Sequence, residues 1–252
     1  MGSFPLHNFV YNVVAIDCLQ FHFNNGLYMK EPESNSLKIP IGGIQLNGDL
    51  VLPVDARGLV LFAHGSGSGR LSPRNRYVAG VLQQSGLGTL LFDLLTPEEE
   101  REDEFTGHLR FNINLLAERL EMVTRWLIEE NRPRDFQLGY FGASTGAAAA
   151  LIAAAELGDR IDAVVSRGGR PDLAGNALPQ VRAATLLIIG GQDDVVLKLN
   201  QQACERLQIE KELKVIPGAT HLFQESGALE AVARLAADWF LAHFHALEHK
   251  TV

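Results

Sequence analysis

The chain has 252 residues, of which 46% are hydrophobic and 21% charged. This composition excludes an intrinsically disordered protein and suits one large domain or two small ones. The two cysteines, Cys18 and Cys204, are too few for a disulfide framework or a four-thiolate zinc site. The formal net charge of −8 argues against a nucleic-acid partner, and −5 of it comes from the run of six acids and one arginine at 98–104.

The amino-terminal end shows no secretory signal pattern. It carries no positive charge before Lys30, and polar residues interrupt its apolar stretches. The longest low-polarity run elsewhere, Gly146–Ala155, is far shorter than the roughly 20 residues that span a bilayer. We therefore expect a cytoplasmic protein with reduced thiols and no membrane attachment.

Residues 1–28 differ in character from the rest of the chain, because they are rich in aromatic residues and lack clear periodicity. We interpret them as an amino-terminal extension, and residues 29–252 as a single domain. The extension either packs on the domain or on a second subunit, in which case a homodimer is a possible assembly, or it forms a loosely ordered arm.

The first predicted elements are short strands. Residues 37–40 and 43–53 predict a hairpin, with its turn at Asn47-Gly48, because an Asn-Gly pair adopts the positive φ angles of a tight turn. Gly58–Ala63 is a continuous apolar run, typical of a strand that is buried on both faces.

After these strands, predicted helices alternate with apolar strands. This alternation is typical of an α/β fold, with a mostly parallel sheet of about eight strands and helices on both faces. No internal repeat or linker divides the chain. The predicted helices are 72–84, with Ser72 as N-cap, 115–131, 145–157, 197–207 and 229–245, and the predicted strands are 86–95, 136–141, 161–166, 184–189 and 212–216.

The strongest local motif is Gly142-Ala143-Ser144-Thr145-Gly146, which matches Gly-x-Ser-x-Gly between a predicted strand and a predicted helix. On such a sharp turn a serine is strained and its hydroxyl exposed, and glycines are needed because side chains there would clash. We predict that Ser144 is a nucleophile. The alternative is a glycine-rich turn with a passive serine.

A serine hydroxyl needs a base to become nucleophilic. Of the eight histidines, His221 directly follows the last predicted strand, and we predict that it is the general base. The alternative is a loop histidine that a local hydrogen bond satisfies.

The base in turn needs an orienting acid after the preceding strand, where Asp193 and Asp194 compete. The spacing Gly190-x-x-Asp193-x-x-Val196 favours Asp193, which leaves Asp194 as a solvated neighbour or a helix cap. The chain order serine, aspartate, histidine is the order expected of an α/β-hydrolase.

An acyl-transfer enzyme must also stabilise an oxyanion. We expect the backbone amides of Thr145 and Ser66 to form the oxyanion hole, with Gly67 as an alternative to Ser66. The loop His64–Gly69 lacks the Gly-Lys-Ser/Thr ending of a P-loop and the spacing of a dinucleotide fingerprint. No His/Asp/Glu cluster has metal-ligand spacing, so neither a metal nor a cofactor is expected.

From about residue 37 to the end, the chain resembles the α/β-hydrolase superfamily, and within it the dienelactone-hydrolase-like proteins. This resemblance implies an α/β-hydrolase fold and hydrolysis of carboxylic esters or lactones without metal or cofactor. Dienelactone hydrolases proper have a cysteine nucleophile, and Ser144 in its place favours a serine carboxylesterase. The resemblance rests on His64–Ser68, Gly142–Gly146, Ser166–Asp172, Gly190–Val196 and Gly218–His221.

The same resemblance implies that arginines hold a substrate carboxylate, the alternative for each being a surface ion pair. A second candidate feature is a flap at Thr96–Phe111, whose acids would disfavour anionic substrates if they border the pocket. Possible substrate-binding residues are Gly67, Arg70 and Arg167, and further candidate arginines are Arg74, Arg76 and Arg170.

The leading hypothesis is a serine carboxylesterase acting on small to medium esters. A lactone, thioester or amide hydrolase is an alternative, because all of these reactions pass through the same oxyanion intermediate. An alternative from another class is a hydrolase-fold protein that binds a ligand with little turnover.

Overall fold

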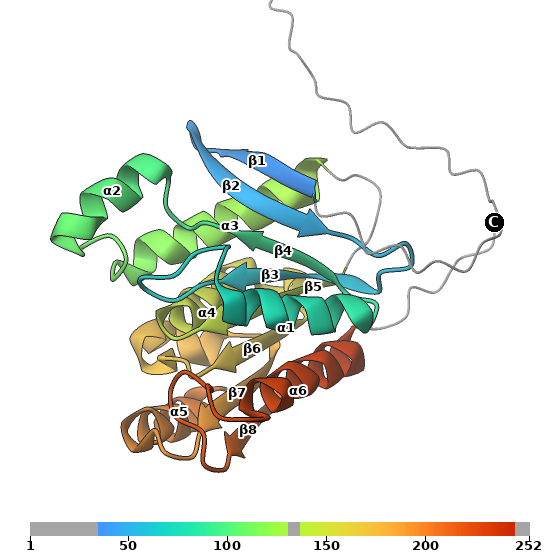
Figure 1. Cartoon of the computed structure of the whole chain (residues 1–252), viewed down its shortest axis with the longest axis vertical. Helices are drawn as coiled ribbons and strands as arrows, with labels where there is room; N and C mark the ends of the chain where they lie inside the picture. Colours follow the sequence, from blue (N-terminus) through green and yellow to red (C-terminus); the bar gives the residue numbers. More distant parts are fainter. Residues whose placement is uncertain (1–34, 131–136, 245–252) are drawn as a thin grey trace, which may run out of the picture. The chain divides into compact units, whose positions relative to one another are not determined.

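The computed structural model describes residues 35–130 and 137–244, so the predicted extension at 1–28 lies outside the described residues (Figure 1). The described strands form one eight-stranded sheet in the order β1-β2-β4-β3-β5-β6-β7-β8. Strand β2 is antiparallel to β1 and β4, and all other neighbours are parallel. The strands are β1 (Asn35–Ile41), β2 (Ile44–Val51), β3 (Gly58–Ala63), β4 (Gly88–Phe92), β5 (Gln137–Ala143), β6 (Ala163–Arg167), β7 (Ala184–Gly190) and β8 (Lys211–Ile216).

Helices cover both faces of the sheet, which confirms the predicted α/β-hydrolase architecture. Helices α1 and α6 pack together on one face, while α3, α4 and α5 lie on the other (Figure 1). None of the described helices is long and apolar enough to cross a bilayer. The helices are α1 (Pro73–Gln84), α2 (Pro97–Thr106), α3 (Ile113–Glu130), α4 (Thr145–Leu157), α5 (Asp194–Arg206) and α6 (Ala228–His243), with short 3₁₀ segments at Gly158–Arg160 and Pro171–Gln180.

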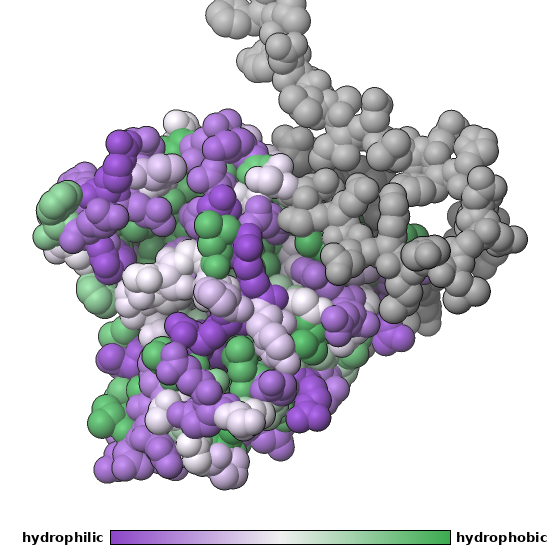
Figure 2. Space-filling view, in the orientation of Figure 1, coloured by the Kyte–Doolittle hydropathy of each residue, from purple (hydrophilic) through white to green (hydrophobic). Residues whose placement is uncertain are grey.

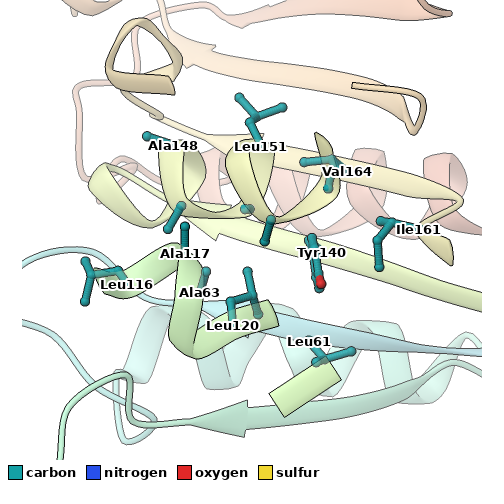
Figure 3. Packing of buried hydrophobic residues seen from close by; sticks show 14 of the residues in the cluster. Leu61, Ala63, Leu116, Ala117, Leu120, Tyr140, Ala148, Leu151, Ile161 and Val164 are labelled. Carbon is teal, nitrogen blue, oxygen red and sulfur yellow. The ribbon is translucent and has the colours of Figure 1, made fainter. Parts of the chain in front are cut away.

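The alanine-rich helix α4 lies in the core, where it packs against α3 and against β5 of the sheet (Figure 3). Its small side chains let the helix lie close to its neighbours, with Ala148 and Leu151 completely buried. Across this core the Tyr140 hydroxyl is 2.7 Å from Thr124 Oγ1, which satisfies both buried polar groups. This hydrogen bond joins β5 to α3, the two elements against which α4 packs just after Ser144.

The predicted hairpin is present, but its predicted turn is wrong. The chain turns at Gly42 and Gly43, whose φ angles are +51° and +85°. Asn47 and Gly48 lie inside β2, paired with Lys38 and Leu37. The glycine at 48 serves packing instead, because a Cβ there would lie 2.9 Å from the Ile39 side chain.

The candidate flap contains a helix that periodicity did not predict. Helix α2 has no apolar face, and a capping box starts it: Thr96 accepts from the Glu99 amide at 3.1 Å, and Glu99 accepts from the Thr96 amide at 2.8 Å. Gly107 ends it with φ +65°. Only the capping residues at its two ends could have indicated this helix from the sequence, because its few apolar residues show no helical spacing.

Candidate active site

Ser144 lies on the strained turn between β5 and α4, with φ +52° and ψ −121°. The backbone is too crowded there for larger neighbours. A Cβ on Gly142 would lie 2.4 Å from Ala147 Cα, and one on Gly146 would lie 2.1 Å from the Ala63 carbonyl oxygen. The two glycines of the motif therefore permit a conformation that a non-glycine residue adopts only under strain.

His221 and Asp193 are in contact, with 2.7 Å between His221 Nδ1 and Asp193 Oδ2. The histidine side chain is 39% exposed and the aspartate 16%. If Nδ1 carries the proton and donates it to the carboxylate, Nε2 is left free to accept one. Asp194, in contrast, is exposed at the start of α5, so the structure brings Asp193 to the histidine.

The end of β6 lies beside both the serine and the histidine. The Ser144 amide donates to the Arg167 carbonyl at 3.2 Å. A Cβ on Gly168 would lie 3.6 Å from His221 Cε1. Among the described residues no hydrogen bond joins Ser144 to His221, and in unliganded enzymes such contacts often tighten only with substrate.

The loop that carries His221 is anchored by a residue that sequence reasoning missed. Phe223 is buried and adopts φ +53°, unusual for an aromatic residue. The Arg167 guanidinium carbon lies 5.8 Å from the centre of its ring. No local pattern marked Phe223, because its role depends on contacts with distant segments.

His64, which lies outside the histidine–aspartate pair, holds the loop after β3. It is buried, and its Nε2 accepts from the Leu94 amide at 3.0 Å, while Nδ1 lies 3.1 Å from the Gly65 carbonyl. Burial lowers the pKa of His64, because a charged imidazole would lose its hydration there. The neutral ring therefore ties this loop to the end of β4.

The two expected oxyanion residues contact each other. The Ser66 amide donates to Thr145 Oγ1 at 2.9 Å, so a hydroxyl oxygen already occupies this donor. Gly67, the alternative, has φ +70° and open space where a Cβ would be. The backbones approach closely at this point, because a Cβ on Gly65 would lie 3.0 Å from the Ala143 carbonyl oxygen.

A cavity of about 430 Å³ lies beside the same loop, on the side that faces α2. Glu100 and Glu104 of α2 line it, so the candidate flap does border a pocket. Figure 2 shows hydrophilic residues over this part of the surface (upper left). Burial and the nearby Asp93 carboxylate raise the pKa of Glu100. Ser144 and His221 are not among the lining residues of this cavity.

The structure separates the candidate arginines into two groups. Three of them have carboxylate partners: Arg70 with Asp93 and Asp49, Arg76 with Asp49, and Arg170 with Asp172.

Arg74 and Arg167 have no carboxylate partner among the described residues. The Nε atom of each is buried without a hydrogen-bond partner. Arg167 is only 7% exposed, and burial, together with the nearby Arg74, lowers its pKa to about 10. The Arg167 guanidinium therefore stays charged near neutral pH, and no described carboxylate balances it.

Acidic, histidine and cysteine side chains gather in no group of three or more that could hold a metal ion, as far as the described part of the chain extends. The groups that the structure brings together are a strained serine, a histidine–aspartate pair and backbone amides.

Comparison with known proteins agrees with this fold. Residues 23–235 match the family model described as "Alpha/beta hydrolase family". The structure of a dienelactone hydrolase from Anabaena variabilis is 56% identical, with a TM-score of 0.84, and the match covers 86% of this chain and 100% of that one. An esterase from Pyrococcus furiosus, 18% identical with a TM-score of 0.67 over 85% of this chain and 94% of its own, shares the fold.

A curated relative from Mycobacterium tuberculosis (strain H37Rv) is named "Putative phosphoribosyl transferase". It is 56% identical over 207 residues, which make up 82% of this chain but 46% of the relative. The chain thus spans about half the length of the curated relatives it matches. The fold, the family model and the dienelactone hydrolase structure agree, and the chain belongs to the alpha/beta hydrolase family.

Proposed function

We propose that the protein is a serine carboxylesterase that hydrolyses small to medium carboxylic esters through an acyl-enzyme. The observation that carries this proposal is the 2.7 Å contact between His221 and Asp193 beside the strained turn of Ser144. A histidine oriented by a carboxylate is the base that a serine hydroxyl needs.

In the proposed reaction Ser144 Oγ attacks the ester carbonyl carbon while its proton passes to His221 Nε2. Asp193 holds the imidazole and stabilises its charged form. The backbone amide of Thr145 stabilises the oxyanion together with an amide of the loop after β3, that of Ser66 or its alternative Gly67. The intermediate then collapses, and His221 gives its proton to the leaving alkoxide. Water, activated by the same histidine, hydrolyses the acyl-enzyme and frees Ser144.

Lactones are the second candidate substrates, because the 56% identical structure is named a dienelactone hydrolase. Thioesters and amides remain alternatives on chemical grounds, since they share the tetrahedral intermediate. The transferase name belongs to relatives of which this chain covers only 46%. We therefore do not include a transferase activity in the proposal.

The unpaired arginines favour substrates that carry an anionic group. A buried charge without a carboxylate partner costs free energy, which an anionic ligand would offset. Arg167 adjoins both Ser144 and His221 through its backbone and the following glycine. We therefore extend the proposal to esters whose acyl or alcohol part bears a carboxylate or phosphate, held by Arg167 and Arg74.

A panel of p-nitrophenyl esters of increasing chain length tests the proposed function. Ser144→Ala should reduce turnover to background, a loss on the order of 10⁶-fold. Asp193→Asn should lower kcat by about 10⁴-fold, because the imidazole loses its orienting acceptor. Asp194→Asn is the matched control and should stay within about twofold, as a surface substitution.

Two outcomes would contradict the proposal. Undiminished turnover by Ser144→Ala would show that Ser144 is not the nucleophile. If the unsubstituted protein hydrolyses no ester, lactone or thioester but binds these compounds, the ligand-binding alternative replaces the enzyme.

A further inference from the structure

The oxyanion region contains a hydroxyl group that the proposed mechanism does not use. Thr145, the first residue of α4, is 6% exposed, and its Oγ1 accepts a hydrogen bond from the Ser66 amide at 2.9 Å. Both residues are expected to supply backbone amides to the oxyanion. The hydroxyl oxygen therefore lies within hydrogen-bond reach of the Ser66 amide, one of the two donors expected at the oxyanion.

A threonine hydroxyl that accepts one hydrogen bond still has a proton to donate. Within a helix this proton usually goes to the carbonyl four residues earlier, as in Thr124, which donates to the Leu120 carbonyl at 2.8 Å. At the first position of α4 the residue four places earlier, Phe141, belongs to β5. Among the described residues the Thr145 hydroxyl proton has no acceptor.

The position of this hydroxyl is fixed by its surroundings. A Cβ on Gly146 would lie 2.5 Å from the His64 carbonyl oxygen, so the start of α4 and the loop after β3 meet backbone to backbone. His64 in turn ties that loop to Leu94. Because the two segments meet this closely, the Ser66–Thr145 hydrogen bond can form and orients the hydroxyl.

We propose that the Thr145 hydroxyl is a donor of the oxyanion hole beside the Thr145 amide, in a chain in which the Ser66 amide donates to Oγ1 and Oγ1 donates to the oxyanion. The hydrogen bond that Oγ1 accepts from the Ser66 amide polarises the hydroxyl and makes it a stronger hydrogen-bond donor. This inference rests on the proposed esterase function and adds the Thr145 side chain to its backbone amide.

The first test compares Thr145→Val, which removes the hydroxyl at nearly constant shape, with Thr145→Ser, which keeps it. On p-nitrophenyl butyrate we expect the valine variant to lose on the order of 100-fold in kcat, while KM changes less than about threefold. The serine variant should stay within about fivefold of the unsubstituted protein. Thr185→Val is the control, because it removes another buried threonine hydroxyl, one that lies in β7 and donates to the carbonyl of Ala183, just before that strand.

The second test needs no turnover. The trifluoromethyl ketone 1,1,1-trifluoro-4-phenylbutan-2-one adds the Ser144 oxygen to its carbonyl carbon, which leaves an oxyanion on the former carbonyl oxygen and the serine proton on His221. Fluorine NMR should show about 100-fold weaker adduct formation in Thr145→Val, as for kcat. Binding of 4-phenylbutan-2-one, which lacks the fluorines and stays planar, should not change.

Three results would overturn the inference. A valine variant as fast as the unsubstituted protein, or faster, would show that the hydroxyl is idle or blocks the Ser66 amide. A serine variant as slow as the valine variant would assign the effect to packing of the methyl group. Equal weakening of both ketones would indicate a general distortion. Failure of the esterase proposal itself would look different, because the unsubstituted protein would then show no turnover that depends on Ser144.

Discussion

The two sides of the candidate site handle charge in opposite ways. On the side of α2 and the loop after β3, arginines are neutralised within the protein, as in Arg70 with Asp93 at 2.6 Å and Arg110 with Asp103. On the side of α1 and the end of β6, Arg74 and Arg167 have no carboxylate partner in the described residues.

This difference indicates which residues serve structure and which serve a ligand. A paired arginine is already satisfied, so it anchors a loop and has little to offer a substrate. An unpaired and buried arginine is costly until an anion arrives. The contrast also bears on the role of the flap. Its acids border a cavity, but Arg74 and Arg167, the arginines without a described carboxylate partner, are not among the residues that line that cavity.

Among tests of this contrast, the largest effect should come from replacing Arg167, which has no carboxylate partner among the described residues. Mono-p-nitrophenyl succinate and its methyl ester form a matched pair, one anionic and one neutral. Arg167→Met should lower kcat/KM for the anionic ester by roughly 10- to 100-fold, equivalent to about 1.5–3 kcal/mol for a lost charge-assisted hydrogen bond. The neutral ester should be nearly unaffected.

Arg76→Met is the control, because Arg76 is exposed and already paired with Asp49 at 3.4 Å. It should change both rates less than about twofold. Arg167→Met should also match or exceed the thermal stability of the unsubstituted protein, since it removes an uncompensated buried charge. Equal losses on both esters would contradict an anion-binding role.

On the opposite side, His64 should make stability depend on pH. Its pKa in the folded protein is lowered by burial, so the unfolded chain binds a proton more readily. The contribution of the neutral ring is therefore complete above the unfolded pKa of about 6.5 and is lost as the pH falls toward the folded pKa. The free energy of unfolding should decline by up to about 1.4 kcal/mol per pH unit in this range.

His64→Gln keeps an acceptor for the Leu94 amide but does not titrate, so urea denaturation at several pH values should show a flatter profile. His108→Gln is the control, because His108 is exposed and only its Nδ1 contacts Thr106. Parallel profiles for the His64 variant and the unsubstituted protein would rule out this origin of the pH dependence.

A smaller and local effect is expected at the base of α2. Burial alone would raise the pKa of Asp103, but hydrogen bonds from Arg110 and from the Leu109 amide, at 2.6 Å, lower it. The ionised carboxylate therefore stabilises α2 above the unfolded pKa, and this stabilisation is lost as the pH falls through the folded pKa. Asp103→Asn should speed amide exchange in α2 by on the order of tenfold while α4 stays protected.

Glu102→Gln, an exposed change on the same helix, serves as the reference for that experiment. If exchange in α2 is the same in both variants, the carboxylate does not tether the helix. If α4 also loses protection in Asp103→Asn, the effect is global, and α2 is part of the cooperative fold.

Much of the fold and several contacts of the site follow from local sequence. The ends of α4 and β3 were predicted to the residue, because a strand–turn–helix motif and a continuous apolar run carry strong signals. Asp193 and His221 were paired from their positions after successive strands, and the 2.7 Å contact follows from parallel strands ending at one edge.

What the sequence did not reveal depends on distant partners. The Ser66 amide and the Thr145 hydroxyl are 79 residues apart, and no pattern in either segment indicates that they meet. The unpaired state of Arg167 has the same origin, since it is set by which carboxylates the fold places nearby. Helix α2 was missed for a different reason, because its residues are polar all round and only its caps mark it.

The smallest expected effect tests whether the acidic side influences the reaction at all. Glu100 lines the cavity beside the oxyanion loop, and its carboxylate should weakly repel an anionic substrate. Glu100→Gln should therefore raise kcat/KM for mono-p-nitrophenyl succinate by about twofold, the size of an exposed charge interaction. The gain should shrink in high salt, because exposed charges are screened.

Glu98→Gln is the matched control for this change, since Glu98 lies on the same helix, pairs with Arg101 and does not line the cavity. Equal rates for the two variants would show that the charge of α2 does not reach the reaction, and would leave the arginines as the sole source of the contrast between the two sides.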